Sequence, residues 1–379
     1  MSHKKYQWKA SKKIFDADIV HTFFGKNNID TYEYLKSFEA ALPSKMKVQY
    51  LTCYCNNEIV AIAFLQQFRF GAFTIQETNF FKNLGIKILF NLFPCHFSYC
   101  GSLFCIALPG LAFKESLSDE SKTEIINELA AQHKTTVTVI KDIRNKNLFN
   151  NFSNDKVCFP VSLDSTMEMK MEEDWKTFDD YLAALQHKYR QKAKKVLSGF
   201  ENVLLKELSI EEIELHKNRI YELYLNVLNK QTFRLGKIEA NYFSELKKGL
   251  KENFIVTGYF LNNELIAFRS AFLMKDRMEI HFIGFDYGTN KEMQVYFNIL
   301  YDNIKFAIEK NVKTLELGRT AQDAKRIIGA IPKQFDDVIF FKTAFFKKLF
   351  DFLYPRYNNN ENSLPIRNPF KPKGNDINL

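Results

Sequence analysis

The chain of 379 residues is 46% hydrophobic and 26% charged, which is ordinary globular usage. This composition excludes a mostly disordered chain, a collagen-like repeat and a coiled-coil rod. With 53 basic and 44 acidic residues the net charge is +9. That excess favours anionic partners, namely phosphate-bearing cofactors, nucleic acid or an anionic membrane surface, but a lysine-rich solvated surface is the simpler explanation. The length predicts two to three domains.

The cysteines and the first ten residues indicate the cellular compartment of the protein. The six cysteines form no Cys-x-x-Cys pair and have no clustered histidine partner, so we predict no metal site. Cys53 and Cys55 fit buried apolar positions of a strand better than a disulfide. Residues 1–10 are polar and basic, without the apolar core of a signal peptide. We therefore expect a cytoplasmic protein, with peripheral binding at the inner face of the membrane as a further option.

The first half of the chain predicts a hairpin, an apolar stretch, a helix and a strand. Residues 46–70 hold two β-rich runs around a turn at Asn56-Asn57-Glu58. Residues 88–113 carry no formal charge, but Pro94 and Gly101 divide them into runs of strand length, so buried strands and loops are predicted. A face that touches lipid is the alternative. Ser118 or Asp119 suits the N-cap of a helix to about residue 133, and a strand over 135–140 follows.

Two helices are predicted between the halves. Residues 174–199 predict one long helix that Gly199 ends, and residues 210–229 predict a second. The end of the long helix holds five bases and no acid: Lys188, Arg190, Lys192, Lys194 and Lys195. Such a face suits a cofactor phosphate, a tRNA backbone or anionic lipid, while a solvated helix is the alternative.

The second half repeats the plan of the first. A hairpin is predicted over 254–274, with Asn262-Asn263-Glu264 at its turn. A strand over 278–286, a helix over 292–310 and strands over 314–317 and 338–341 follow. Because one matching hairpin can arise by chance, this internal repeat is a hypothesis.

The C-terminal part is predicted to pack less well. Residues 345–354 are aromatic and basic and predict either a helix that covers the core or a contact with a membrane surface. Residues 358–379 are rich in Asn, Pro and Lys, which is typical of a loose tail.

This order of elements in two tandem copies resembles the FemAB-like branch of the GNAT acyltransferase superfamily. Residues 178–185, followed by the basic residues 188–195, resemble the Tyr-Leu helix of that branch. Gly284-Phe285-Asp286 is similar to the turn after the fourth GNAT strand. Leu317-Gly318-Arg319, Asp323-Ala324-Lys325 and Gly329-Ala330 are similar to the Gly–Lys–Gly signature after the fifth strand. The resemblance covers residues 175–341 and, more weakly, 31–143.

The resemblance implies an α/β fold with a mixed sheet and two tandem GNAT-like domains. Their expected bounds are 1–170 and 171–345, with a basic aromatic segment and flexible tail at 346–379. Classical GNAT acetyltransferases hold the cofactor pyrophosphate on a Gly-rich loop at a helix N-terminus. Residues 287–294 lack that loop, so the resemblance does not by itself imply acetyl-CoA.

The candidate catalytic residues lie in or beside the strand over 278–286. Acylation of an amine needs the amine neutral, so a base within hydrogen-bond reach helps. His281 suits this role, and Glu279 shares its face because side chains two apart in a strand do. Asp286 ends the same strand. A structural histidine is the alternative for His281. No Ser/His/Asp or Cys/His set has the spacing of a nucleophile, so a covalent mechanism is not predicted.

The candidate binding residues are mostly basic. Arg319, Lys325 and Arg326 follow a strand and suit a phosphate or a carboxylate, as do Lys188 and Arg190. Arg234, in a loop between helices, is a candidate substrate contact. Surface solvation is the alternative for the five residues other than Arg234.

The resemblance implies a GNAT-type N-acyltransferase. It would move an acyl group from an acyl thioester, such as acyl-CoA, to a primary amine on a small or lipid-linked acceptor, with acyl-CoA as a co-substrate and no tightly bound cofactor. The first alternative is a FemAB-type transferase that uses aminoacyl-tRNA in cell-wall peptide synthesis. The second is a GNAT-fold binding protein without chemistry, because function depends on the site and not on the fold. An anionic membrane surface is a further partner, tRNA is less favoured, and DNA is not expected.

Overall fold

The computed structural model describes residues 5–25, 29–70, 95–106, 108–132, 135–231, 236–353 and 367–372. The contacts divide the chain into two compact units. Unit 1 comprises Met1–Asp164, Gln231–Glu245 and Gln334–Asn362, and unit 2 comprises Ser165–Lys230, Leu246–Lys333 and Ser363–Leu379. The expected domain bounds at residues 170 and 345 make each domain one continuous segment, whereas the chain returns to unit 1 twice. The reason is that pairing between strands distant in the sequence decides where a segment packs.

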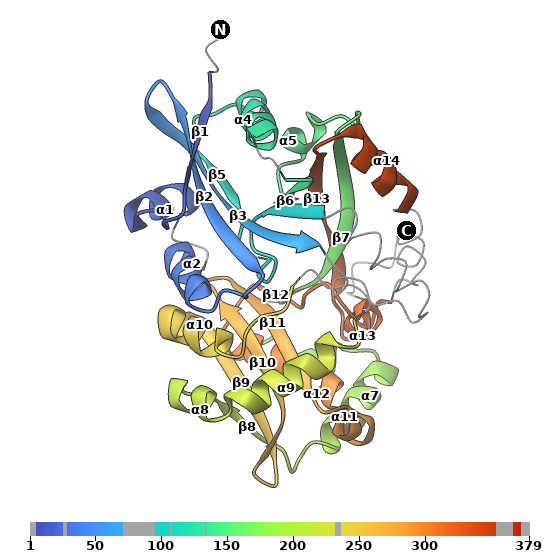
Figure 1. Ribbon diagram of the computed structural model, residues 1–379. Helices are drawn as coiled ribbons and strands as arrows, with labels where there is room; N and C mark the ends of the chain where they lie inside the picture. Colours follow the sequence, from blue (N-terminus) through green and yellow to red (C-terminus); the bar gives the residue numbers. More distant parts are fainter. Residues whose placement is uncertain are drawn as a thin grey trace. The chain divides into compact units, whose positions relative to one another are not determined.

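Unit 1 is built on a mixed sheet with the strand order β1-β2-β3-β4-β6-β13-β7, and β5 also pairs with β3 (Figure 1). Its strands are β1 (Gln7–Ser11), β2 (Met46–Cys55), β3 (Glu58–Phe70), β4 (Cys95–Cys100), β5 (Leu111–Phe113), β6 (Val137–Ile143), β7 (Cys158–Lys170) and β13 (Ile331–Phe341). Strands β7 and β13 each begin in one unit and end in the other.

Helices cover both faces of the sheet in unit 1. They are α1 (Ala17–Phe24), α2 (Thr31–Ala40), α4 (Asp119–Gln132), α5 (Lys146–Asn150) and α14 (Ala344–Leu353). Tyr50 and Leu51 are neighbours in β2 and therefore point to opposite faces. The Tyr50 hydroxyl donates to Glu39 of α2 over 2.8 Å, whereas Leu51 packs with Leu129 of α4. This alternation places α2 and α4 on opposite faces.

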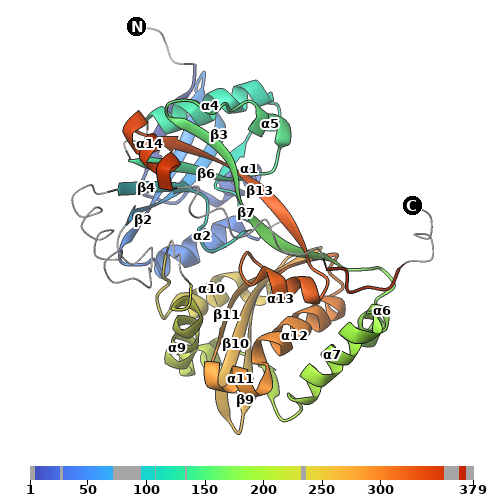
Figure 2. The ribbon, with the colours of Figure 1, turned by 90° about the vertical axis from the view of Figure 1, so that its right-hand side faces the viewer.

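Unit 2 is built on the order β7-β12-β11-β10-β9-β8. Its strands, besides the end of β7, are β8 (Leu204–Glu207), β9 (Phe254–Leu261), β10 (Glu264–Leu273), β11 (Arg277–Phe285) and β12 (Thr314–Glu316). Its helices are α6 (Phe178–Ala184), α7 (His187–Ser198), α8 (Ile210–Leu215), α9 (Lys217–Leu228), α11 (Tyr287–Met293), α12 (Val295–Glu309) and α13 (Gln322–Ile327), while α10 (Tyr242–Leu250) crosses the unit boundary. Helix α9 lies on one face of the sheet, and α12 with α7 lies on the other (Figure 2).

The predicted α/β fold with two similar units is confirmed, because both units contain the same succession of elements. In unit 1 the hairpin β2–β3 leads to β4, α4 and β6, and β6 is parallel to β4. In unit 2 the hairpin β9–β10 leads to β11, α12 and β12, and β12 is parallel to β11. Both hairpin turns place two asparagines at positive φ: 50° and 65° at Asn56 and Asn57, and 50° and 67° at Asn262 and Asn263. Two central residues at positive φ are typical of a type I′ turn.

Two predicted helices are each divided in two. The helix predicted over 174–199 forms α6 and α7, which are separated by the extended Leu185 (ψ 143°). The Gln186 N–H donates to the Pro369 carbonyl over 2.8 Å, and Leu185 bridges to Phe370. A distant segment therefore takes the backbone groups that a continuous helix would use. The helix predicted over 210–229 likewise forms α8 and α9, with His216 between them.

The loose tail predicted over 358–379 is wrong for residues 367–372. The Phe370 ring packs 5.5 Å from that of Trp175 and 6.2 Å from that of Tyr181. Partial burial of this aromatic ring holds the segment on unit 2. Helix α14 bears out the prediction of a helix that covers the core, because Phe346 and Phe350 pack against Phe341 and its neighbours.

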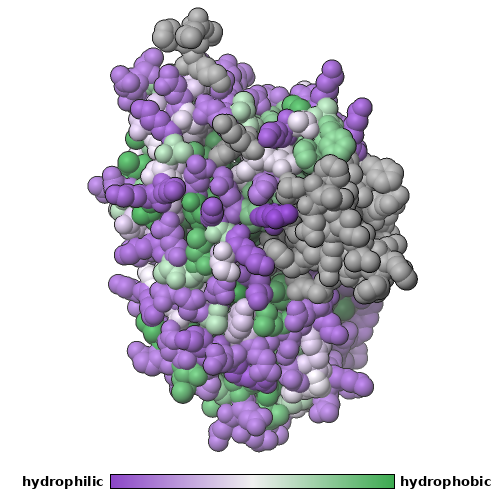
Figure 3. All heavy atoms as spheres, viewed as in Figure 1, coloured by the Kyte–Doolittle hydropathy of each residue, from purple (hydrophilic) through white to green (hydrophobic). Residues whose placement is uncertain are grey.

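The uncharged stretch is described only from residue 95 onward, and residues 88–94 lie outside the described ranges. Its described part forms β4 and β5, as predicted. The six cysteines are thiols that take part in no disulfide. Within the described ranges the helices lack the length and apolarity that crossing a lipid bilayer requires. On the face shown in Figure 3 most described residues are hydrophilic, and hydrophobic side chains reach the surface in small separate patches.

Candidate functional site

The parallel pair β11–β12 forms the centre of the candidate site in unit 2. Its ladder joins Arg277 to Thr314, Met278 to Leu315 and Glu279 to Glu316. Strand β12 ends there, while β11 continues to Phe285. The residues after Glu279 on β11 therefore lie at the point where the two parallel strands separate.

A β-bulge shapes β11 immediately after this point. Ala271 of β10 pairs with Ile280 and Arg269 pairs with Ile283, so β11 has one residue more than β10 in between. The Phe282 N–H, which leaves the regular ladder, donates to the Ser270 hydroxyl oxygen over 3.1 Å.

The bulge also brings α9 into close contact with the strand. The Phe282 ring lies 5.0 Å from that of Tyr224 on α9. A Cβ atom added at Gly284 would lie 2.6 Å from the Tyr224 nitrogen. Only glycine therefore lets the backbone of α9 approach the strand this closely.

His281 lies in the bulge and is half-buried. Its Nδ1 is 3.4 Å from the Ser270 hydroxyl oxygen. Its ring centroid is 4.7 Å from that of Phe272 and 6.0 Å from that of Phe254. The hydroxyl and the aromatic rings fix the orientation of the imidazole, which suits both a positioned base and a structural histidine.

Three carboxylates lie side by side on the face of the sheet that carries His281. Glu316 pairs with Glu279 on one side and with Glu168 of β7 on the other. Arg277 joins two of them, with its Nη1 2.9 Å from Glu168 and its Nη2 2.6 Å from Glu316. Glu316 also accepts hydrogen bonds from the Thr166 hydroxyl and from the Gly318 N–H, the latter over 3.1 Å.

The carboxylates differ in their proton affinity. Burial raises the pKa of Glu316 to about 7, and the nearby charge of Glu279 adds to the rise, although Thr166 and Arg277 act against it. Burial would also raise the pKa of Glu168, but hydrogen bonds from Lys333 and Arg277 outweigh it and the pKa is lowered. Glu316 is therefore the member of this row suited to exchange a proton near neutral pH.

The loop after β12 carries the signature residues. Gly318 adopts a φ of +80°, which favours glycine. The Lys325 Nζ donates to the Gly318 carbonyl over 3.1 Å and to the Thr320 carbonyl. Lys325 is buried, so its amine holds the loop in shape. Arg319 and Arg326 are half-buried on the loop and on α13.

The structure brings only some of the predicted site residues together. Glu279 and His281 share one face of β11, next to the loop of Arg319 and Lys325. Asp286 instead caps α11, where its carboxylate accepts from the Thr289 N–H over 3.1 Å. Helix α7, with Lys188 and Arg190, packs against α12 on the opposite face of the sheet. Arg234 lies outside the described residues.

Sequence reasoning missed the remaining members of the network around Glu316. These are Thr166, Glu168, Arg277, Glu316 and Lys333. Glu316, an acidic residue within an apolar strand, was the signal that could have revealed this network. Such a residue is seldom fully buried unless it is paired. Among the described residues no group of three or more His, Cys, Asp or Glu side chains is arranged to hold a metal ion.

Comparisons with known proteins extend this description. The sequence profile of the FemAB-like family, described as peptidoglycan biosynthesis and recognition, matches residues 119–363. No curated protein matches the chain in sequence. The crystal structure of FemX resembles this structure with a TM-score of 0.54 at 9% identity, over 91% of this chain and 99% of that chain. L-PGS from Bacillus licheniformis gives a TM-score of 0.48 at 10% identity, over 88% and 97% of the two chains. The likeness to FemX shows a common fold.

Proposed function

Because this chain belongs to the FemAB-like family, we propose that it is a transferase that moves an acyl or aminoacyl group onto an amine. The family match includes β11, β12 and the signature loop, and therefore the whole network around Glu316. The description of the family supports the amine of a cell-wall peptide precursor as the acceptor. The observation that carries the proposal is a buried carboxylate with a pKa of about 7 where two parallel strands separate.

The proposed chemistry is direct attack in a ternary complex. An amine must lose a proton before or as it attacks a carbonyl carbon. Glu316 would accept that proton with Glu279, its neighbour in the ladder, and His281 would help to orient the amine. A C–N bond forms, the thioester or ester bond of the donor breaks, and the proton passes to the leaving group. No covalent bond to the protein is needed.

Basic side chains would hold the donor. Arg319 and Arg326 suit a phosphate of the donor because the guanidinium group offers a bidentate fork, while Lys325 would act by holding the loop. Lys188 and Arg190 on α7 would add a more distant contact to a polyanionic donor. A nucleotide thioester and an aminoacyl-tRNA both carry such phosphates, so the donor must be identified by assay.

The test is a transfer assay on the full-length protein with labelled acyl-CoA or aminoacyl-tRNA and a lysine-containing peptidoglycan precursor. We expect product with one of these donors. In Glu316→Gln the rate should fall by about 10²-fold or more, as is typical for the loss of a general base. Lys291→Ala, a change on exposed α11, is the control. Wild-type rates in Glu316→Gln and in His281→Ala would exclude the proposed mechanism.

Binding experiments can distinguish the two candidate donors before transfer is measured. A ligand that binds only the folded state raises the melting temperature by mass action. Stabilisation by acyl-CoA that is reduced in Arg319→Ala would support the thioester donor. Stabilisation by charged tRNA alone, fading with salt and with Lys188→Ala/Arg190→Ala, would support the aminoacyl donor. Binding of the precursor without transfer from any donor would favour a recognition protein and reject the enzyme.

A further inference from the structure

Residues 367–372, which we call the C-terminal strap, lie against the turn between α13 and β13. A Cβ atom added at Gly329 in this turn would clash with the Cε2 and Cζ atoms of the Phe370 ring. The ring therefore occupies the space that a side chain at position 329 would need, and only glycine lets it approach the backbone this closely. Gly329 belongs to the signature that follows β12, so the strap reaches the signature itself.

Backbone hydrogen bonds on both sides of Phe370 fix its place. The Gln186 N–H donates to the Pro369 carbonyl over 2.8 Å, and the Lys371 N–H donates to the Ala184 carbonyl over 3.0 Å. These bonds join the strap to the break between α6 and α7. The position of the Phe370 ring is therefore set by directional bonds as well as by packing.

Helix α6 also holds the turn that the ring contacts. The Tyr181 hydroxyl donates to the carbonyl of Ile328, the residue before Gly329, over 2.9 Å. Tyr181 and Ile328 are buried in one hydrophobic cluster, and Phe370 packs against it. Removal of the ring would therefore leave a space beside the turn.

The turn is bonded to the last residues of α13. The Gly329 N–H donates to the Arg326 carbonyl over 3.1 Å, and the Ala330 N–H donates to the Lys325 carbonyl over 3.0 Å. A shift of the turn would therefore move the backbone of both basic residues. Of these two, Lys325 holds the signature loop and Arg326 is a candidate donor contact.

From Lys325 the contacts continue to the proposed general base. The Lys325 Nζ donates to the Gly318 carbonyl over 3.1 Å, and the Gly318 N–H donates to Glu316 over 3.1 Å. A contiguous series of packing contacts and hydrogen bonds therefore leads from Phe370 to the Glu316 carboxylate. Networks of this kind can carry an effect from one group to another.

We propose that Phe370 is a positioning residue for the transfer reaction. Its ring fixes the turn at Gly329, the turn fixes α13, and Lys325 then holds the loop whose N–H group binds Glu316. Without the ring, α13 would also move the guanidinium of Arg326 relative to the donor. The inference rests on the proposed function, because it gives the strap a part in the same site.

A purely structural role of Phe370 makes a different prediction. Loss of a packing contact alone would lower the free energy of unfolding but would leave the proton affinity of Glu316 unchanged. In the proposed role, loss of the ring also weakens the hydrogen bond from Gly318, which acts to lower the pKa of the Glu316 carboxyl. In Phe370→Ala this carboxyl should therefore take up its proton at a higher pH.

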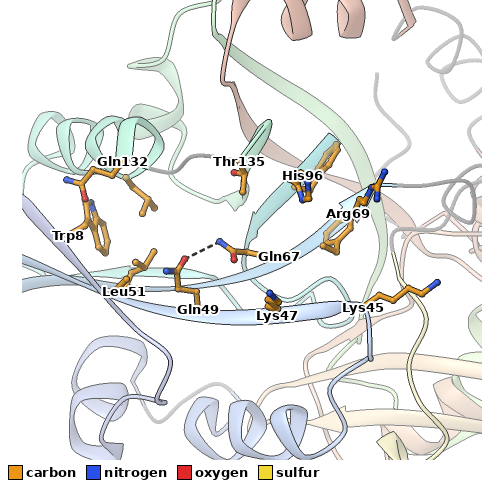
Figure 4. A pocket seen from close by; sticks show the side chains of 14 residues that line it. Trp8, Lys45, Lys47, Gln49, Leu51, Gln67, Arg69, His96, Gln132 and Thr135 are labelled. Carbon is orange, nitrogen blue, oxygen red and sulfur yellow. Dashed lines mark hydrogen bonds between the residues drawn. The ribbon is translucent and has the colours of Figure 1, made fainter. Parts of the chain in front are cut away.

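The test uses the full-length protein and needs no substrate. Phe370→Ala removes the ring, and Phe370→Leu keeps part of its apolar contact. Phe297→Ala, the first control, removes another half-buried ring that packs against the same cluster. Phe97→Ala, the second control, removes a half-buried ring from the lining of the unit 1 cavity shown in Figure 4.

Two quantities are measured in each variant. Hydrogen exchange with mass spectrometry reports the opening of residues 317–330. Urea unfolding with and without Glu316→Gln, repeated from about pH 4 to about pH 8, reports the pH at which Glu316 titrates in the folded protein.

We expect residues 317–330 to exchange about tenfold faster or more in Phe370→Ala, and less so in Phe370→Leu, because the turn loses its support. Glu316 should titrate at a higher pH in Phe370→Ala than in wild type. Both controls should exchange within about twofold of wild type and leave the titration unchanged. Unchanged exchange or unchanged titration in Phe370→Ala, or the same changes in a control, would overturn the proposal.

A double-mutant cycle tests the contact between the ring and the turn. Gly329→Ala places a methyl group where the ring lies, so it should destabilise the wild type by overpacking. In Phe370→Ala the ring is absent, so Gly329→Ala should destabilise less, and the remainder reflects the φ of +102° at this residue. Equal losses in the two backgrounds would refute the contact on which the proposal depends.

Failure of the proposed function would give a different result. Absence of transfer with every donor would reject the transferase, whereas exchange and titration would still decide whether Phe370 positions the loop. Transfer by Phe370→Ala with the wild-type KM for the donor and the wild-type pH–rate profile would instead reject the role of Phe370 and retain the transferase.

Discussion

Glu316→Gln should change how the stability of the protein depends on pH. The carboxyl of Glu316 is fully buried, and its pKa is raised from 4.5 to about 7. At about 1.4 kcal/mol for each pH unit, holding Glu316 ionised in the folded state costs about 3 kcal/mol. Glutamine keeps the shape of the side chain but cannot ionise, so this cost disappears in the variant.

The direction in which the free energy of unfolding changes with pH follows from proton binding. Between pH 4.5 and about 7 the folded protein binds more protons at Glu316 than the unfolded chain does, so the free energy of unfolding falls as the pH rises. This stabilising contribution is fully present below the unfolded pKa and is lost as the pH rises through the folded pKa. Wild type should therefore lose about 3 kcal/mol more than Glu316→Gln between about pH 4 and about pH 8.

The measurement is urea unfolding of both proteins across this pH range, with Glu309→Gln at the exposed end of α12 as the control. Other groups titrate in all three proteins, so the difference between the curves isolates Glu316. Parallel curves for wild type and Glu316→Gln would refute the reasoning. They would mean that Arg277 and Thr166 keep the carboxylate ionised in the folded protein.

Three further changes test the packing of unit 2. Gly284→Ala would place a Cβ 2.5 Å from the Leu223 carbonyl carbon and should cost about 1–3 kcal/mol in urea unfolding; Gly199→Ala, with no contact nearer than 3.6 Å, is the control, and an equal effect of both would contradict the close contact with α9. Asp302→Ala leaves Arg269, which is 1% exposed, without its carboxylate at 2.9 Å and should lower the free energy of unfolding by about 3–5 kcal/mol. Asp276→Ala breaks an exposed pair with Lys313 and should lower it by about 1 kcal/mol or less. The reverse order of these two losses would disprove that the buried Arg269–Asp302 pair contributes more to stability than the exposed pair of Asp276 with Lys313. Gln186→Ala removes two side-chain hydrogen bonds of 3.0 Å to the Asn368 and Phe370 carbonyls, so trypsin should cut after Arg367 faster than in wild type. Unchanged cleavage would show that the Phe370 ring and the backbone hydrogen bonds hold the segment without the Gln186 side chain.

Much of the fold could be predicted because its signals are local. The two hairpins follow from β-rich runs on either side of Asn-Asn pairs, since asparagine tolerates the positive φ that the turn requires. The N-cap at Ser118, whose hydroxyl oxygen accepts from the Ser121 N–H over 3.3 Å, follows from a short polar segment. The signature after β12 could likewise be predicted, because Gly318 and Lys325 lie close together in the sequence, on one short loop and the helix that follows it.

The candidate site could be predicted only in part, because its charges meet through strand pairing. Glu279 and His281 were found as neighbours on one strand, but Thr166 and Glu316, which share a hydrogen bond, lie 150 residues apart in the chain. The sequence shows neither which strand lies beside β12 nor the register of the pair. For the same reason it did not reveal that α7 packs on the other face. The cap at Asp286 is, by contrast, a local feature, because its carboxylate accepts from the N–H of Thr289 three residues later.

The sequence by itself determined the two hairpins with their turns, the strands and helices that follow each of them, and the repeated order of these elements, because these depend on backbone preferences within a few residues. Tertiary structure decided the course of the chain between the two units, the break between α6 and α7, and the row of carboxylates around Arg277. Each of these depends on a contact between distant segments, such as the Gln186 N–H with the Pro369 carbonyl. The raised pKa of Glu316 belongs with them, because burial is a property of the packed sheet and not of the residue.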